Sequence, residues 1–131
     1  MKHVLCIVLS LIMTLSVFSS TMFVKAADSS VGTIGLTYEL NDDGQSYTVT
    51  GSSEVICGEL IIPDTYNGVE VTQIGNSAFS GCTRITKITV PSSVTKVGNS
   101  AFANCDKLET VIFEGDTCTF GTEAFYNCRS I

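Results

Sequence analysis

The residues from position 71 onward repeat with a period of 23, and this period constrains the fold more than any other feature of the sequence. Segments 71–93 and 94–116 align without a gap, and 117–131 begins a third copy. Four positions are identical in all three copies: Gly75, Gly98 and Gly121; Ala78, Ala101 and Ala124; Phe79, Phe102 and Phe125; Cys82, Cys105 and Cys128. A fixed period of about 20 to 30 residues indicates one small unit stacked on copies of itself.

Each repeat predicts a short strand with one apolar face. Each of the first two copies has three apolar residues at positions i, i+3 and i+5, and the last two are separated by one outward residue, as a strand requires. They are Ile85, Ile88 and Val90 in the first copy and Leu108, Val111 and Phe113 in the second. Pro91 ends the first strand, because proline cannot continue a hydrogen-bonded ladder. Stacked repeats therefore place these strands in a parallel sheet.

The segment between strands predicts a tight turn and one helical turn. Gly75 and Gly98 stand where a turn needs positive φ. Asn76 or Ser77 is expected to cap one turn of helix. Phe79, Phe102 and Phe125 are then expected to stack as a buried ladder, since no single repeat can cover such a ring. The predicted fold is an α/β solenoid with parallel strands and short helical turns.

The repeat resembles the BspA-like leucine-rich repeats. The stretch that carries the resemblance runs from Ile74 to Pro91, IGNSAFSGCTRITKITVP, and it recurs from Val97 to Phe113. The resemblance implies a surface or secreted protein, and several family members are implicated in adhesion. Glu114 departs from the pattern where the previous copy has Pro91, and Thr117, with Cys118 beside it, takes the core position that Val71 and Val94 hold. The third copy is therefore expected to be locally irregular.

Residues 1–26 have the layout of a secretory signal peptide. No charged residue occurs from Val4 to Phe23, and Val24 and Ala26 suit a signal peptidase. The alternative is an uncleaved membrane anchor, because about 20 apolar residues can span a bilayer. We expect residues 27–34 to form a flexible tail.

Residues 35–70 predict a β-rich cap that ends in a degenerate first repeat. Two alternating segments flank the turn sequence Asn41 to Gly44, which favours a β-hairpin. A strand is expected from about Val55 to Ile62. A solenoid needs such a cap, because its first repeat otherwise exposes the core. The chain stops inside the third repeat, which we interpret as a fragment of a longer protein; the alternative is that another chain covers this end.

Charge and composition argue against several functions. Removal of residues 1–26 takes away Lys2, Lys25 and the one histidine, His3, and leaves 5 basic and 13 acidic residues. Nucleic acids and anionic membranes bind through Lys and Arg, so neither is an expected partner. The loss of histidine removes the usual general base and the commonest zinc ligand. We therefore expect no catalytic residues, no metal and no cofactor, and hence no enzyme.

The repeated cysteines have two interpretations. Cys82, Cys105 and Cys128 are expected to form a ladder of buried free thiols. The alternative is a Cys82–Cys105 disulfide, because export permits it and stacked coils lie about 5 Å apart. A zinc site is disfavoured because no C-x-x-C pair occurs.

The outward face of the predicted strands is the candidate binding site. Lys87, Thr89, Thr110 and Ile112 lie between the inward residues and should point to solvent. Solenoids build extended binding surfaces from such repeated faces. The sequence therefore predicts a secreted or cell-surface module that binds an extracellular protein or glycan. The alternative is a spacer that presents a downstream domain, possibly an enzyme.

Overall fold

The computed structural model describes residues 32–131. The expected signal peptide and residues 27–31 of the expected tail lie outside this range. Thr33, also expected in the tail, is bonded to the neighbouring chain segment. Its N–H donates to the Ile61 carbonyl at 2.8 Å, and its hydroxyl oxygen accepts from the Ile61 N–H at 2.8 Å.

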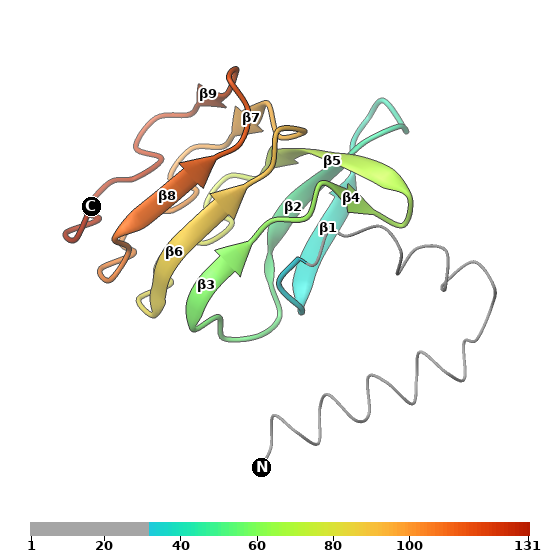
Figure 1. The fold of residues 1–131 in the computed structure, drawn as a ribbon. Coiled ribbons are helices and arrows are strands. Elements are labelled where there is room, and N and C mark those ends of the chain that lie inside the picture. Colours follow the sequence, from blue (N-terminus) through green and yellow to red (C-terminus); the bar gives the residue numbers. More distant parts are fainter. Residues whose placement is uncertain (1–31) are drawn as a thin grey trace, which may run out of the picture.

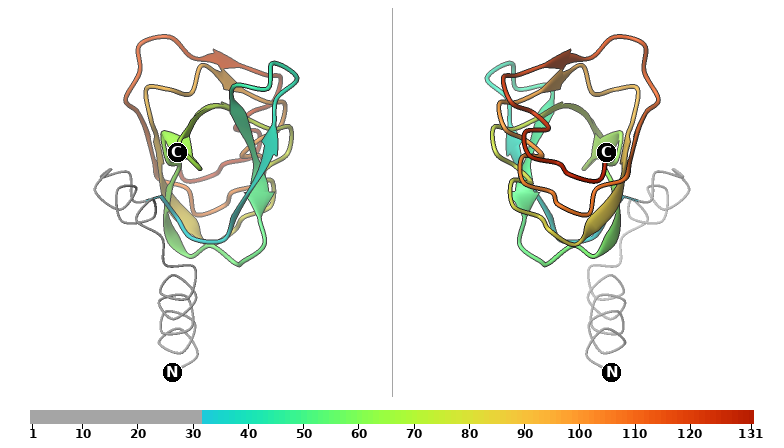
Figure 2. Two further views of the ribbon diagram at one scale, coloured as in Figure 1. Left: turned by 90° about the vertical axis from the view of Figure 1, so that its right-hand side faces the viewer. Right: turned by 90° about the vertical axis from the view of Figure 1, so that its left-hand side faces the viewer.

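Nine strands form two sheets within the described range (Figure 1). The long sheet has the order β1-β2-β5-β7-β9, with β4 paired to β5, and the three-stranded sheet has the order β3-β6-β8. Their bounds are β1 Leu36–Leu40, β2 Tyr47–Ser52, β3 Gly58–Ile61, β4 Thr65–Tyr66, β5 Val69–Ile74, β6 Ile85–Val90, β7 Lys96–Val97, β8 Thr110–Phe113 and β9 Thr119–Phe120. Viewed at right angles to Figure 1, the chain winds in successive coils around one interior (Figure 2).

The strand pairing confirms a solenoid of parallel strands after an N-terminal antiparallel pair. Pairing of β7 with β9 sets Lys96 opposite Thr119, and pairing of β6 with β8 sets Ile88 opposite Val111. Both offsets equal the period of the sequence. The pairs β1–β2 and β4–β5 are antiparallel, and β1 and β2 flank the predicted turn that begins at Asn41.

The expected helical turns are wrong, because residues 32–131 contain no helix. Ser77, Ser100 and Glu123 adopt φ values of 55°, 53° and 59°, whereas a right-handed helix needs negative φ. The backbone groups instead bond to the next coil. The N–H of Ser77 donates to the Asn99 carbonyl at 2.8 Å, and similar bonds recur along the stack. Hydrogen bonds between coils thus take the place of hydrogen bonds within a helix.

The expected positive φ at Gly75 and Gly98 is also wrong, since neither lies among the left-handed glycines. Close contact between coils explains Gly98 instead. A Cβ there would lie 2.6 Å from the Asn76 nitrogen of the previous coil. The Asn76 side-chain oxygen accepts the Asn99 N–H at 2.8 Å, and the Asn99 oxygen accepts the Thr122 N–H at 2.9 Å. Glycine is needed where this asparagine ladder brings the backbones together.

The repeated phenylalanines lie in the interior, stacked as a ladder. Phe79 and Phe102 are buried, with ring centroids 5.6 Å apart and planes within 6° of parallel. Phe125 continues the ladder at 5.4 Å and 13°, and it is half-buried. Leu60, Ile88 and other aliphatic side chains fill the space around the rings.

The repeated cysteines are free thiols, and the Cys82–Cys105 disulfide is not formed. The Cys105 thiol lies 3.3 Å from the Phe79 carbonyl oxygen, and the Cys128 thiol lies 3.1 Å from that of Phe102, so each thiol donates to the previous coil. Burial raises the pKa of the Cys105 thiol to about 12, so this donor keeps its proton.

The third copy differs from the earlier ones at the position where Thr117 replaces the valine. Val71 and Val94 are buried at this position, whereas Thr117 is exposed. Cys118 packs against the core beside it. The register between coils stays at 23 residues on both sides of this segment, from the Val90–Phe113 pair to the Lys96–Thr119 pair.

Candidate functional site

The outer face of the three-stranded sheet brings together the four residues predicted from the sequence. Thr110 pairs with Lys87 and Ile112 pairs with Thr89 across β6 and β8. Ile88, between them on β6, is fully buried, and successive strand side chains point to opposite faces. Lys87, Thr89, Thr110 and Ile112 therefore lie in two cross-strand rows on one outward surface. Ile112 is 40% exposed, which is high for an isoleucine in a strand.

The charged groups on this face neutralise one another. Glu59 on β3 lies opposite Lys87, and its carboxylate oxygen is 2.7 Å from the Lys87 amine. The Thr89 hydroxyl also donates to this carboxylate, at 3.4 Å. The hydrogen bond from Lys87 and the bond from Thr89 lower the pKa of Glu59. The face thus presents a paired polar strip beside the apolar Ile112.

The sequence reasoning missed Glu59, although a signal for it exists. Glu59 directly precedes the buried Leu60, as Lys87 directly precedes the buried Ile88. Its strand lies in the degenerate first repeat, where the spacing to β6 departs from the repeat period. A search at a fixed period therefore passes over it.

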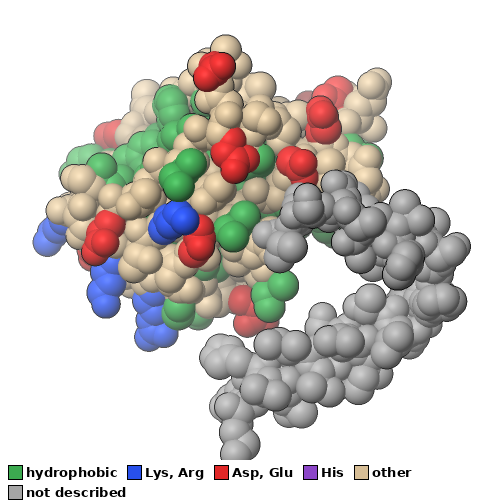
Figure 3. Space-filling model, viewed as in Figure 1, with side chains coloured by type: hydrophobic (Ala, Val, Ile, Leu, Met, Phe, Trp, Pro, Cys, Tyr) green, Lys and Arg blue, Asp and Glu red, His purple; other side chains and the backbone are tan. Residues whose placement is uncertain are grey.

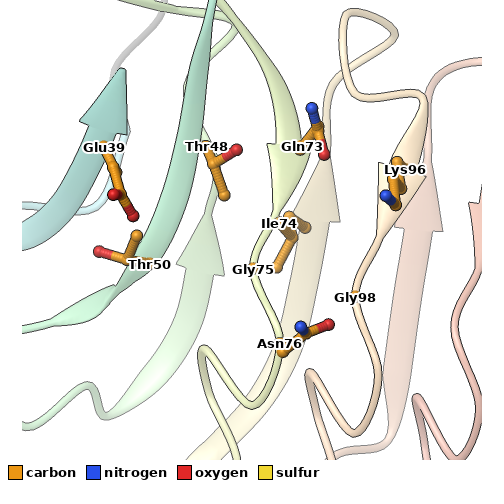
Figure 4. Close-up of a pocket in the computed structure, with 9 residues that line it drawn as sticks. All are labelled: Glu39, Thr48, Thr50, Gln73, Ile74, Gly75, Asn76, Lys96 and Gly98. Carbon is orange, nitrogen blue, oxygen red and sulfur yellow. The ribbon is translucent and has the colours of Figure 1, made fainter. Parts of the chain in front are cut away.

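A second polar row crosses the long sheet. Cross-strand pairing sets Glu39 opposite Thr48, Thr48 opposite Gln73, Gln73 opposite Lys96, and Lys96 opposite Thr119. The row borders a hollow of about 350 Å³ (Figure 4). Its lining residues are Glu39, Thr48, Thr50, Gln73, Ile74, Gly75, Asn76, Lys96 and Gly98.

The repeat pattern of the sequence predicts part of this second row. Gln73, Lys96 and Thr119 occupy the same position in successive copies, and each directly precedes an apolar position of the repeat. Glu39 and Thr48 lie in the cap, which has no period, so no sequence signal links them to the row. The long sheet thus offers a second surface of hydroxyl, amide and charged groups.

Potential metal ligands do not cluster on either face. Among residues 32–131, no three His, Cys, Asp or Glu side chains converge to hold a metal ion. The same range contains no helix that is both long and apolar enough to cross a membrane. Asp43, in the turn that begins at Asn41, is engaged locally, because it accepts the backbone N–H groups of Gln45 and Ser46 at 2.8 and 3.0 Å. The bond from Gln45 is the largest cause of its lowered pKa.

Comparison with known families identifies the repeat. Residues 58–131 match the family described as BspA type Leucine rich repeat region (6 copies). This chain belongs to that family. The match covers more than half of the chain, and the spacing of the paired strands agrees with it. No sequence among curated proteins matches this BspA-type chain.

Solved structures of bacterial leucine-rich-repeat proteins are similar to this BspA-type protein. The T. pallidum Leucine Rich Repeat protein is 25% identical, with a TM-score of 0.72, over 79% of this chain and 48% of that one. A leucine rich cell surface protein from Faecalibacterium prausnitzii is 26% identical, with a TM-score of 0.63, over 76% and 28%. A leucine-rich repeat protein from Bacteroides capillosus is 34% identical, with a TM-score of 0.53, over 65% of each chain.

This BspA-type chain therefore spans about half of the T. pallidum protein and less than a third of the Faecalibacterium protein. The likeness establishes a shared repeat architecture. About half of the T. pallidum protein and more than two thirds of the Faecalibacterium protein lie outside the matched region.

Proposed function

We propose that this BspA-type protein is a binding module, exported to the cell surface or secreted, that holds an extracellular protein or glycan. The observation that carries the proposal is the outer face of β3, β6 and β8. Lys87, Thr89, Thr110 and Ile112 stand there in two rows set by strand register. A rigid sheet holds such rows in place, which reduces the entropy cost of binding.

The composition of this face supports a contact surface. Ile112 offers exposed apolar area, while the Glu59–Lys87 pair beside it offers both donors and acceptors. Interfaces commonly combine an apolar centre with a polar rim. The similar Faecalibacterium protein, which is named a cell surface protein, supports the proposed location.

The test is a binding screen on a printed glycan array and a panel of immobilised matrix proteins. We expect saturable binding of the purified protein to at least one probe. Ile112→Glu should weaken that binding by at least about tenfold, because it puts a charge in place of the exposed apolar side chain of the contact. Val55→Glu is the matched control, since Val55 is also an exposed apolar residue, at 75%, but lies outside the face.

Two results would contradict the proposal. Absence of saturable binding to every probe would remove the binding function. Equal loss in the Ile112 and Val55 variants would remove the site assignment, because the effect would then follow from added charge alone.

A further inference from the structure

Three cationic side chains form a row along the edge of the solenoid where β6 and β8 begin, with one cation in the turn of each coil. Arg84 directly precedes β6 and Lys107 stands one repeat period later, whereas Arg129 lies one residue before the next equivalent position, which Ser130 holds. All three are exposed. Figure 3 shows Lys and Arg side chains gathered along this edge. They are three of the five basic residues in 32–131, a range that holds twelve acidic ones.

The charges in this row are not neutralised within the described part of the protein. Among residues 32–131 the single ion pair joins Lys87 to Glu59, on the neighbouring sheet face. The Arg84 guanidinium reaches only the Cys57 sulfur, at 3.9 Å, and the Arg129 Nε donates to the Asn127 side-chain oxygen at 3.2 Å. Asp106 is the one acidic residue in the turns that hold Arg84, Lys107 and Arg129. It forms no ion pair with any of the three, since the single ion pair joins Lys87 to Glu59.

The spacing of the row matters for what it can bind. Successive coils lie about one strand spacing apart, roughly 5 Å, so the cations follow one another along the solenoid axis. Like charges at this spacing repel one another. The neighbouring row avoids such repulsion by setting Glu59 opposite Lys87. The edge row therefore places three cations, with Asp106 beside Lys107, along one edge of a molecule whose described residues are mainly acidic.

We propose that Arg84, Lys107 and Arg129 bind an extended acidic polysaccharide that runs along the solenoid axis. Sulfate or carboxylate groups that recur along such a polymer can pair with one cation per coil. A flat anionic membrane fits less well, because it would face a wider area of a molecule whose residues 32–131 include twelve acidic and five basic side chains. Single-stranded nucleic acid relies on a series of aromatic side chains for stacking, and Tyr126, near Arg129, is the one aromatic residue within three sequence positions of these cations.

The test measures binding of the purified protein to a sulfated heparin decasaccharide. We expect saturable binding whose affinity falls with salt, with a log–log slope of about −2 to −3 for three ion contacts. The double variant Lys107→Gln/Arg129→Gln should bind at least about tenfold more weakly, because two charge-assisted contacts are lost. The matched control Lys87→Gln/Lys96→Gln removes the same net charge elsewhere and should stay within about threefold. Far-UV circular dichroism checks that both variants fold.

Several outcomes would overturn the proposal. These are no saturable binding at about 50 mM salt, equal losses in the two double variants, or equally tight binding to phosphatidylserine vesicles or oligo(dT). The polysaccharide site on the row and the binding site on the β3-β6-β8 face can be tested separately. Ile112→Glu should leave decasaccharide binding within about threefold of wild type, since that residue lies outside the row.

Discussion

The two ends of the stack cover the apolar interior in different ways. At the N-terminal end Tyr38 and Tyr66 stack at 3.9 Å, and Tyr47 meets Tyr66 edge-on at 5.1 Å. Burial, and then the nearby Tyr66, raise the pKa of Tyr38 to about 12. At the other end Phe120 packs edge-on against Phe113 at 5.2 Å, yet remains 50% exposed.

The contrast arises from neighbouring coils and not from residue type. Ile74, Val97 and Phe120 occupy one repeat position, and the first two are 1% and 0% exposed. Phe120 is the largest of the three and the most apolar by area, but among residues 32–131 its coil has a neighbouring coil on one side only. A side chain at a given repeat position therefore does not make a fixed contribution to the free energy of unfolding. Its contribution depends on how many coils pack against it.

The largest expected effect is at Phe102, in the middle of the aromatic ladder. Phe102 is fully buried between the rings of Phe79 and Phe125. Phe102→Ala should lower the free energy of unfolding by about 3 to 5 kcal/mol, because it opens a cavity lined on both sides. Phe125→Ala removes the same side chain from the half-buried end and should cost about 1 to 2 kcal/mol. Urea denaturation measures both.

Two results would contradict the expected difference between Phe102 and Phe125. A loss below about 1 kcal/mol at Phe102 would contradict the stacked geometry. Equal losses at Phe102 and Phe125 would show that burial by a second coil adds nothing.

A smaller effect is expected at the glycine contacts between coils. A Cβ at Gly98 would meet the Asn76 nitrogen at 2.6 Å, and one at Gly121 would meet the Asn99 nitrogen at 2.5 Å. Gly98→Ala should cost about 1 to 3 kcal/mol, since coils on both sides hold that backbone in place. Gly121→Ala should cost less, because the last coil can move away. Thermal unfolding of the two variants measures the difference, and a larger loss at Gly121 would refute it.

The period of the sequence predicts the contacts that each repeat makes with an identical copy. The parallel strands, the position of Phe102 and the outward direction of Ile112 all follow from alternation within a unit that stacks on itself. The structure of the turn does not follow. Ser77 adopts positive φ because its N–H bonds to Asn99 in the next coil, and local helix propensity carries no information about that bond.

The residues of the second polar row also differ in whether the repeat period predicts them. Lys96 and Thr119 on the long sheet recur with the period, so their surface was readable. Glu39 belongs to the cap and reaches the row only through the antiparallel pairing of β1 with β2. Register in a hairpin depends on turn geometry, and the sequence pattern does not specify it to the residue.

The smallest expected effect concerns the thiol of the middle coil. Cys105 is fully buried, and burial, with added repulsion from Cys128 and Cys82, raises its pKa to about 12 from 9.0. Its unfolded counterpart ionises at lower pH, so this thiol stabilises the fold fully below about pH 9 and loses that contribution as the pH rises toward 12. Cys105→Ala should therefore flatten the decline in unfolding free energy between about pH 8 and 10.5, which urea titrations at several pH values measure.

In the wild type, iodoacetamide should label Cys105 more than about tenfold more slowly than the exposed Cys57, because alkylation needs the thiolate. Equal labelling rates, or an unchanged pH dependence in Cys105→Ala, would mean that the middle coil opens as readily as the surface. The distinction between covered and uncovered coils would then not hold in solution, because a thiol beneath two neighbouring coils would be as accessible as one on the outside.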